Sequence, residues 1–296
     1  MKQRHRDMII VAAVAFANHA LTFLAYDWYA GVDGYSYDAC GLQLVTGCFF
    51  DLFPVMLREP LIPLVKNVLY VLFENNVCAL GAVIHALGIA AAVLSCRLGS
   101  RFGRRVGLAL GLIFAVYLPI SVYFHHISSP TIFIPLLLVC ADRLCAWLKK
   151  PTVRRLLLLA CSVTAAFLAK SEALLFIPIV IACGFSCRVR WQHAALFLLI
   201  TGGAYAGVSF WYYQTLGYFG LTHKAGWVLF ERMYRPPDRM FDPAAGPASA
   251  HVSAILDREI IRMIDRYDPR SAQMSAFMFA QKELGYAAAD ALFLRA

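Results

Sequence analysis

The chain has 296 residues, of which 60% are hydrophobic and only 15% are charged. This composition excludes an ordinary soluble domain, in which about a quarter of the residues carry a charge. A formal net charge of +9 would suit a nucleic-acid-binding protein, but the basic residues lie in short clusters between long apolar segments. The composition therefore indicates a polytopic α-helical membrane protein.

Seven apolar segments are long enough, or nearly long enough, to cross a hydrocarbon core of about 30 Å, which takes roughly 20 helical residues. They cover residues 8–26, 78–96, 106–124, 130–148, 156–169, 173–186 and 194–212. The fifth and sixth are short, and we expect them to form a tight hairpin whose flanking Arg and Lys side chains reach the interface. The predicted fold is an all-α membrane protein with about seven transmembrane helices, which form one seven-span membrane module over residues 1–212.

Lys and Arg residues predict the orientation of these segments. Clusters precede the first segment and fill the second, fourth and sixth connections, as in Arg97–Arg105, Lys149–Arg155 and Arg188–Arg190. Short loops rich in Lys and Arg remain in the cytoplasm. We therefore expect a cytoplasmic N-terminus, a long external first loop with short helices over residues 26–77, and an external helical tail over residues 213–296. Because topology accounts for the charge, we expect no nucleic-acid partner.

The first predicted external loop gathers ionisable and aromatic residues. It contains DGYSYDACGLQLVTG from residue 33 and REPLIPLVKNVLY from residue 58. A carboxylate at the membrane surface, such as Asp33 or Asp38, can act as a general base or orient a polar substrate. Arg58 can clamp a phosphate with two parallel hydrogen bonds. A solvated loop with incidental charges explains the same residue types, so both interpretations stay open.

Other polar residues flank or enter the predicted spans. His125 and His126 can donate to a phosphate or bind a metal, although histidines at the end of a span also occur as ordinary interfacial residues. We expect Glu172 to form a local ion pair with Lys170. His85 lies inside the second span, where we expect it to hydrogen-bond a neighbouring backbone carbonyl, although an ionisable residue in a membrane span also invites a functional interpretation.

The tail begins with an aromatic run that is typical of the membrane–water interface. Beyond a Pro-rich stretch, we expect a helix over 249–267 with Ser249 as its N-cap, and a second helix over 272–296. The chain ends within this second predicted helix. We therefore expect a truncated or short member of its class.

The loop motifs resemble those of the integral-membrane GT-C glycosyltransferases, in particular the dolichyl-phosphate-mannose–protein mannosyltransferases and the bacterial lipid A aminoarabinose transferases. The positions that fit the family pattern are Asp33, Tyr37, Ala39, Gly47, Arg58, Pro60 and Pro63. The stretch FLAKSEALLFIPIVI also resembles the family's hairpin between the fifth and sixth spans, with Lys170 and Pro178 at the matching places. The chain departs from the pattern at Gly34, where the mannosyltransferases have Glu.

This resemblance implies an enzyme that moves a sugar from a polyprenyl-phosphate carrier to a lipid, glycan or protein acceptor, with inversion at the anomeric carbon. Asp33 would be the general base. The substrate-binding residues would be Tyr37, Asp38, Arg58, Glu59, His125, His126, Lys170 and Glu172. We expect Arg58 and Lys170 to converge on one phosphate in a cavity open to lipid. The resemblance fixes no cofactor and leaves a divalent metal open, and it implies the bacterial inner membrane with the active site on the periplasmic face.

Two other classes of protein remain open. A transporter or flippase for a lipid-linked substrate would place charged residues or broken helices near the bilayer midplane, whereas the acidic groups here lie in the predicted external loop. A non-catalytic membrane or assembly subunit would share the same helices without turning over a substrate. Turnover of a labelled polyprenyl-phosphate sugar separates an enzyme from such a subunit.

Overall fold

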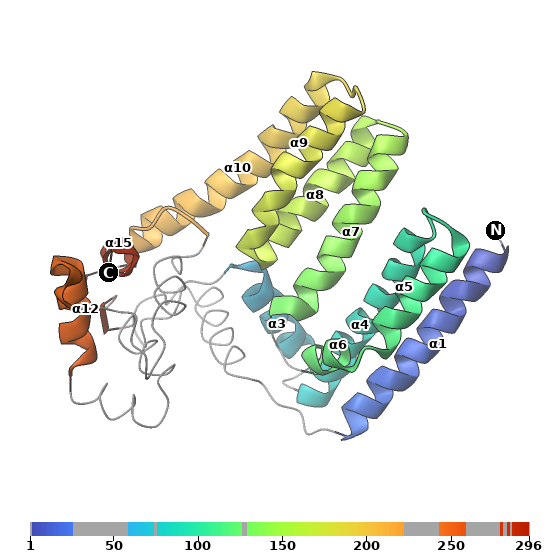
Figure 1. Ribbon diagram of the computed structural model, residues 1–296, viewed down its shortest axis with the longest axis horizontal. Helices are drawn as coiled ribbons and strands as arrows, with labels where there is room; N and C mark the ends of the chain where they lie inside the picture. Colours follow the sequence, from blue (N-terminus) through green and yellow to red (C-terminus); the bar gives the residue numbers. More distant parts are fainter. Residues whose placement is uncertain are drawn as a thin grey trace. The chain divides into compact units, whose positions relative to one another are not determined.

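A computed structural model describes residues 2–25, 59–73, 76–125, 129–221, 243–258, 279–280, 283–284 and 286–295. All regular secondary structure in these ranges is helical (Figure 1). The chain forms two compact units. The first contains the described residues up to Tyr205, and the second contains those from Ala206 onward.

The helices of the first unit follow the predicted apolar segments. They are α1 (Lys2–Ala25), α3 (Leu61–Leu72), α4 (Val77–Gly99), α5 (Arg104–Val116), α6 (Leu118–Tyr123), α7 (Ser129–Lys149), α8 (Val153–Ala169), the 3₁₀ turn η1 (Ser171–Leu175), α9 (Phe176–Ser186) and the first part of α10 (Trp191–Leu216). Within the described ranges, four helices (α1, α4, α7 and α10) are long and apolar enough to cross a membrane. The all-helical class is therefore confirmed, and seven crossings remain a prediction.

Close helix packing forms the centre of the first unit. Helices α1, α4 and α5 pack against one another, and α4 also packs against α7, which pairs with α8. Glycines permit this approach: a Cβ added at Gly107 would stand 2.7 Å from the carbonyl oxygen of Cys96, and one at Gly111 would stand 2.8 Å from a methyl group of Val11. Such small residues at helix contacts are typical of membrane helices, whose association depends on tight packing.

The apolar segment at 106–124 is two helices in the structure, separated by an extended residue, Tyr117 (φ −71°, ψ 97°). Pro119 has no N–H to donate to the carbonyl oxygen of Ala115, four residues earlier. The side chain of Asn18 in α1 donates to that oxygen instead, with Nδ2 and O 2.9 Å apart. An asparagine in the first apolar segment therefore satisfies a carbonyl that a proline in the third leaves open.

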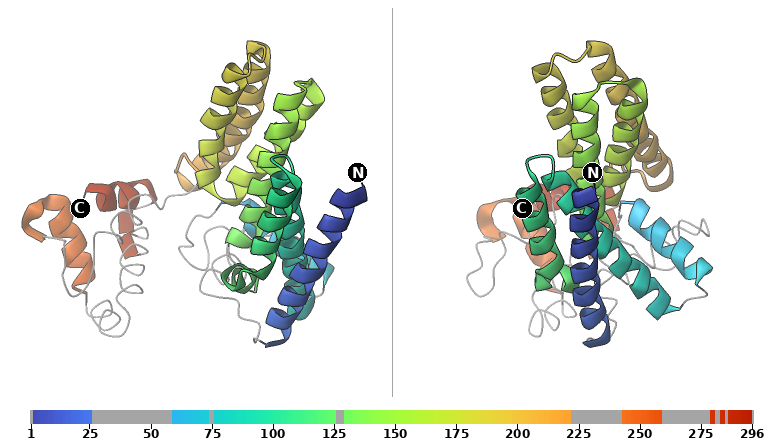
Figure 2. Two further views of the ribbon diagram at one scale, coloured as in Figure 1. Left: turned by 45° about the vertical axis from the view of Figure 1, so that its right-hand side comes forward. Right: turned by 90° about the vertical axis from the view of Figure 1, so that its right-hand side faces the viewer.

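The connections of the first unit lie at two opposite ends (Figures 1 and 2). The start of α1 and the α4–α5, α7–α8 and α9–α10 connections lie at one end, which we call the basic end because these segments carry the Lys and Arg clusters. The start of α4, the end of α6 and the end of α8 lie at the other, which we call the polar end. This arrangement places each predicted basic cluster at the same end of the bundle.

The second unit contains the rest of α10, the turn η2 (Pro243–Ala245), α12 (Pro247–Leu256) and α15 (Tyr286–Arg295). Helix α12 packs against η2 and α15. The predicted N-cap at Ser249 is wrong, because the helix begins at Pro247, and proline fits the first turn of a helix. Arg258 donates two hydrogen bonds to Glu283, of 2.5 and 3.0 Å, and this guanidinium lowers the pKa of the Glu283 carboxyl.

Candidate functional site

The residues that follow the R-x-P-x-x-P motif form α3, a short helix with one buried side. Glu59 and Pro60 precede the helix and are buried, as are Ile62, Pro63 and Lys66 within it. Residues three, four and seven positions apart share one face of a helix. This face is the one that α3 buries, and the helix packs against both α8 and α4.

Glu59 joins two segments that lie 112 residues apart in the chain. Its Oε1 accepts one hydrogen bond from the backbone N–H of Ser171, at 3.0 Å, and one from the Ser171 hydroxyl, at 2.9 Å. Only 9% of Glu59 is exposed, and a carboxylate at such a depth requires donors of this kind. Because Ser171 begins η1, directly after α8, these bonds fix the start of α3 beside the segment Lys170–Glu172.

Lys170 follows the last residue of α8, with an extended backbone. Its Nζ lies 3.2 Å from Oε1 of Glu172 and 5.6 Å from the centroid of the Phe133 ring. The predicted ion pair with Glu172 is therefore confirmed. One third of the Lys170 side chain is exposed, and an exposed ion pair contributes little to stability. The ammonium therefore has a defined position beside Glu172 and Phe133. Because the ion pair is weak, another anion can replace Glu172 at a small cost in free energy.

Three histidines from different parts of the bundle form a hydrogen-bonded row, which we call the histidine chain (His19, His85 and His125). Nδ1 of His19 lies 2.8 Å from Nδ1 of His85, and Nε2 of His85 lies 3.1 Å from Nδ1 of His125. At most 5% of each residue is exposed. The expectation that His85 bonds a backbone carbonyl is wrong, since both of its ring nitrogens meet other histidines. A neutral imidazole has one donor and one acceptor nitrogen, so both hydrogen bonds can run in the same direction along the row.

The histidine chain has a tightly packed setting. The His19 ring lies over Gly88 of α4, where an added Cβ would stand 2.4 Å from its Cε1. The Phe124 ring meets His19 edge to face, with centroids 5.8 Å apart, and the Phe23 ring meets His85 with centroids 5.4 Å apart. Gly88 and the rings of Phe23 and Phe124 therefore fix the position of the histidine chain by packing against it.

The geometry of the histidine chain does not suit a metal ion. Its facing nitrogens are close enough to share a hydrogen, whereas an ion between two ring nitrogens needs a bond of about 2.0–2.1 Å to each, with a wide angle between them. In the part of the chain that the structure describes, no group of three or more His, Cys, Asp or Glu side chains is arranged to hold a metal.

Four of the nine predicted site residues lie within the described ranges, and all four belong to the polar end: Glu59, His125, Lys170 and Glu172. The structure links Glu59 to the residue beside Lys170, and it links His125 to the histidine chain. The remaining predicted site residues lie outside the described ranges: Asp33, Tyr37, Asp38, Arg58 and His126. The convergence of Arg58 and Lys170 therefore stays a prediction.

Sequence reasoning missed two residues of this end. Lys66 is only 2% exposed and takes part in an interaction, as a buried lysine must. Its spacing of seven residues from Glu59, on the same face of an apolar helix, was the available signal. Ser171 had no such signal, because its partner Glu59 lies in a distant part of the sequence.

Comparisons of the chain with profiles of protein families, with curated proteins and with solved structures find no match. The likeness to GT-C glycosyltransferases therefore rests on the motif residues quoted above.

Proposed function

We propose that this protein is a membrane glycosyltransferase of the GT-C type, which transfers a sugar from a polyprenyl-phosphate carrier to an acceptor on the outer face of the membrane. One observation carries the proposal: both hydrogen bonds from Ser171 end on Glu59. They join the R-x-P-x-x-P segment to the segment that contains Lys170. These are the two segments whose cations the resemblance assigns to the lipid phosphate.

The membrane setting supports the proposal. The long apolar helices are compatible with an integral membrane protein, and the basic end has the composition of a cytoplasmic surface. The polar end would then face outward, in a bacterial cell toward the periplasm. A polyprenyl carrier keeps its tail in the bilayer and its phosphate at the interface, which is where the end of α8 would lie.

The reaction that we propose is an inverting displacement. The acceptor oxygen attacks the anomeric carbon from the face opposite the carrier phosphate, and the bond between this carbon and the phosphate oxygen breaks. The electron pair stays on that oxygen, which gives a polyprenyl-phosphate dianion, while Asp33 takes the acceptor proton. Fixed positive charge beside the leaving phosphate stabilises the charge that develops in the transition state.

Lys170 has contacts that suit this task. Glu172 and the Phe133 ring hold the ammonium in place before the donor binds, so little reorganisation is needed when the phosphate arrives. The phosphate would replace Glu172 as the partner of the ammonium. Arg58 would add a planar fork to the same phosphate, as the resemblance implies.

Lys170→Gln and Glu172→Gln form a matched pair of variants for testing the proposal. The purified protein in nanodiscs is supplied with a polyprenyl-phosphate hexose or pentose labelled in the sugar, and release of the label from the carrier is measured. We expect Lys170→Gln to raise the KM for the donor at least about tenfold, the loss of one hydrogen bond to a charged group, and to lower kcat as well. Glu172→Gln keeps the cation and removes the carboxylate that the phosphate would displace, so it should not raise the KM for the donor. No turnover of either donor by the wild type, or equal kinetics for the two variants, would contradict the proposal.

A second candidate function is proton-coupled movement of a lipid-linked substrate, and the histidine chain favours it. Ionisable groups buried among membrane helices often carry protons, and the two hydrogen bonds of this row can reverse direction together. A transporter would move the labelled lipid across sealed proteoliposomes under a pH gradient and leave the sugar–phosphate bond intact. His85→Phe would then stop the movement, whereas a transferase would break the bond without any gradient.

A further inference from the structure

A groove at the basic end has a lining rich in cations. Its volume is about 420 Å³, and its walls come from the end of α4, the last turns of α7, the α7–α8 connection and the first turns of α8. Its lining includes five cationic residues and one threonine: Arg97, Arg143, Lys150, Arg154, Arg155 and Thr152. All of these residues belong to the first unit.

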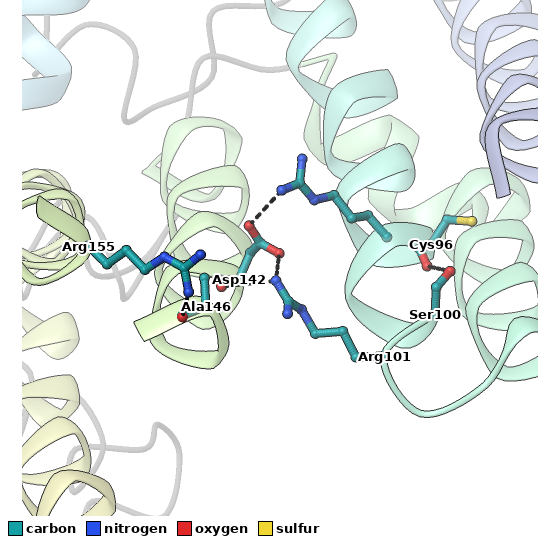
Figure 3. A network of polar contacts seen from close by, with 7 residues as sticks. Cys96, Ser100, Arg101, Asp142, Ala146 and Arg155 are labelled. Atoms are coloured by element: carbon teal, nitrogen blue, oxygen red, sulfur yellow. Dashed lines mark hydrogen bonds and ion pairs between the residues drawn. The ribbon is translucent and has the colours of Figure 1, made fainter. Parts of the chain in front are cut away.

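Two of the lining arginines are held in defined positions (Figure 3). The buried carboxylate of Asp142 lies between two guanidinium groups, 3.3 Å from Arg97 and 2.5 Å from Arg101. On the other side, Nη1 of Arg155 donates to the carbonyl oxygen of Ala146, at 2.7 Å. Lys and Arg side chains without fixed contacts would be enough to keep a short loop in the cytoplasm. The defined contacts of these arginines therefore need a further reason.

The positive charge of the groove is largely unmatched by carboxylates in the described ranges. Asp142 already serves two arginines, and Arg155 is bound to neutral carbonyl groups. The other cations of the lining have no acidic partner among the described side chains: Arg143, Lys150 and Arg154. Like charges gathered around one space repel one another, and an anion in that space would offset the repulsion.

The backbone favours the same kind of ligand. Thr152 is the N-cap residue of α8, and its side chain makes no capping hydrogen bond. Thr152 lines the groove, and the first amides of a helix attract negative charge. Arginine forks match the oxygens of a phosphate, and a lysine adds a mobile point charge.

We infer that this groove binds a phosphate-bearing anion, with a phosphomonoester or a pyrophosphate favoured over a phosphodiester. The higher charge of the first two suits a lining with five cations. A groove of about 420 Å³ has room for more than a single phosphate group. The ligand is either the headgroup of an anionic lipid in the adjoining leaflet or a soluble phosphate compound. This site is separate from the sugar-transfer reaction and does not depend on it.

The full chain in nanodiscs tests this inference in two arms. The lipid arm compares discs of phosphatidylcholine with discs that also contain phosphatidic acid, and bound lipid is measured by native mass spectrometry. The soluble arm adds pyrophosphate to phosphatidylcholine discs and measures the rise in thermal stability, which reports binding to the folded state. The test variant is R143Q/R154Q. The control is R188Q/R190Q, which removes the same charge from the same end but outside the groove.

We expect the wild type and the control to bind in at least one arm, and R143Q/R154Q to bind at least about tenfold more weakly. Binding in one arm alone identifies the source of the phosphate. Equal affinities for the two double variants, or no binding in either arm, would overturn the inference. Equal affinities would show that general attraction to the basic end accounts for the binding. Should R143Q/R154Q fail to fold, K150Q replaces it in the same comparison.

Discussion

Carboxylates meet arginines at the basic end, whereas at the polar end the buried Glu59 meets the N–H and hydroxyl groups of Ser171 and the buried histidines meet one another. Asp7 accepts two hydrogen bonds from Arg104, of 2.8 and 3.0 Å, and Asp142 is paired with two arginines. Glu59 is buried to a similar degree, yet its described donors are the N–H and hydroxyl groups of Ser171. Buried carboxylates are thus paired with arginines at the basic end and with uncharged hydrogen-bond donors at the polar end.

The difference lies in whether a cation is used to stabilise a buried carboxylate. At the basic end, arginines neutralise the two buried carboxylates, Asp7 and Asp142. At the polar end, the uncharged donor groups of Ser171 stabilise the Glu59 carboxylate, so no cation is needed as its partner. Within the described ranges, the ammonium of Lys170 has the exposed Glu172 as its acidic partner, and one third of the Lys170 side chain stays exposed.

The largest expected effect concerns which end faces outward, and two native thiols report it. Cys78 is exposed at the start of α4, and Cys187 is exposed at the end of α9. In variants that keep one of these cysteines, a membrane-impermeant maleimide added to intact cells should label Cys78 and leave Cys187 unlabelled. Labelling of Cys187 alone would reverse the orientation of the two ends.

Removal of the central carboxylate should weaken the basic end most. Asp142→Asn leaves Arg97 and Arg101 without their acidic partner. Removing one partner of a fully buried ion pair destabilises a protein by roughly 3–5 kcal/mol. Because both arginines are partly exposed, we expect a smaller loss here, of about 2–3 kcal/mol in the free energy of unfolding. Thermal unfolding in detergent measures this loss, with Arg97→Gln as the milder control because it retains the bond to Arg101. Equal stability of Asp142→Asn and the wild type would show that the pairing contributes nothing.

The corresponding change at the polar end is Glu59→Ala. It removes both hydrogen bonds that Glu59 accepts and leaves the half-buried N–H of Ser171 without this partner, so we expect a loss of about 1–2 kcal/mol. Glu59→Gln keeps an acceptor oxygen, so its loss in the free energy of unfolding should be less than half of the loss in Glu59→Ala. If Ala and Gln variants unfold at the same temperature, the hydrogen bonds of Ser171 do not hold this end together.

A smaller effect is expected under the histidine chain. Gly88→Ala would press a methyl group against the His19 ring, and the resulting strain should exceed the gain in helix propensity by about 1 kcal/mol. Gly202→Ala is the matched control, because nothing lies within 4 Å of an added Cβ there, and it should stabilise α10. A stabilised Gly88→Ala variant would mean that the row of histidines tolerates displacement.

The sequence predicted the helices well, because a long apolar run is itself the signal for a membrane helix. Helix α4, for example, was expected over 78–96 and extends over Val77–Gly99, with the Asn76 side chain accepting from the N–H of Ala79 at its start. The break at Tyr117 was within reach of sequence reasoning, since Pro119 must leave a carbonyl open. The start of α12 was also within reach, since Pro247 follows Gly246.

The partners within the site were not predictable in the same way. The hydrogen bonds among His19, His85 and His125 depend on how α1 and α4 rotate about their axes and on where the turn after α6 lies, which no local pattern specifies. The contact between Glu59 and Ser171 depends on where α3 docks against α8. Sequence reasoning therefore found several polar residues of this end but paired only Lys170 with Glu172 correctly, because those two lie within one turn of each other.

Turnover of the donor by Asp33→Asn tests the proposed transferase most directly. Asp51→Asn is the control, because it makes the same charge change in the same loop. With a labelled polyprenyl-phosphate sugar and equal amounts of folded protein, we predict that Asp33→Asn lowers turnover at least roughly 10²-fold, as expected for loss of a general base, while Asp51→Asn stays within a few-fold of the wild type. Turnover by Asp33→Asn within a few-fold of the wild type would contradict the account.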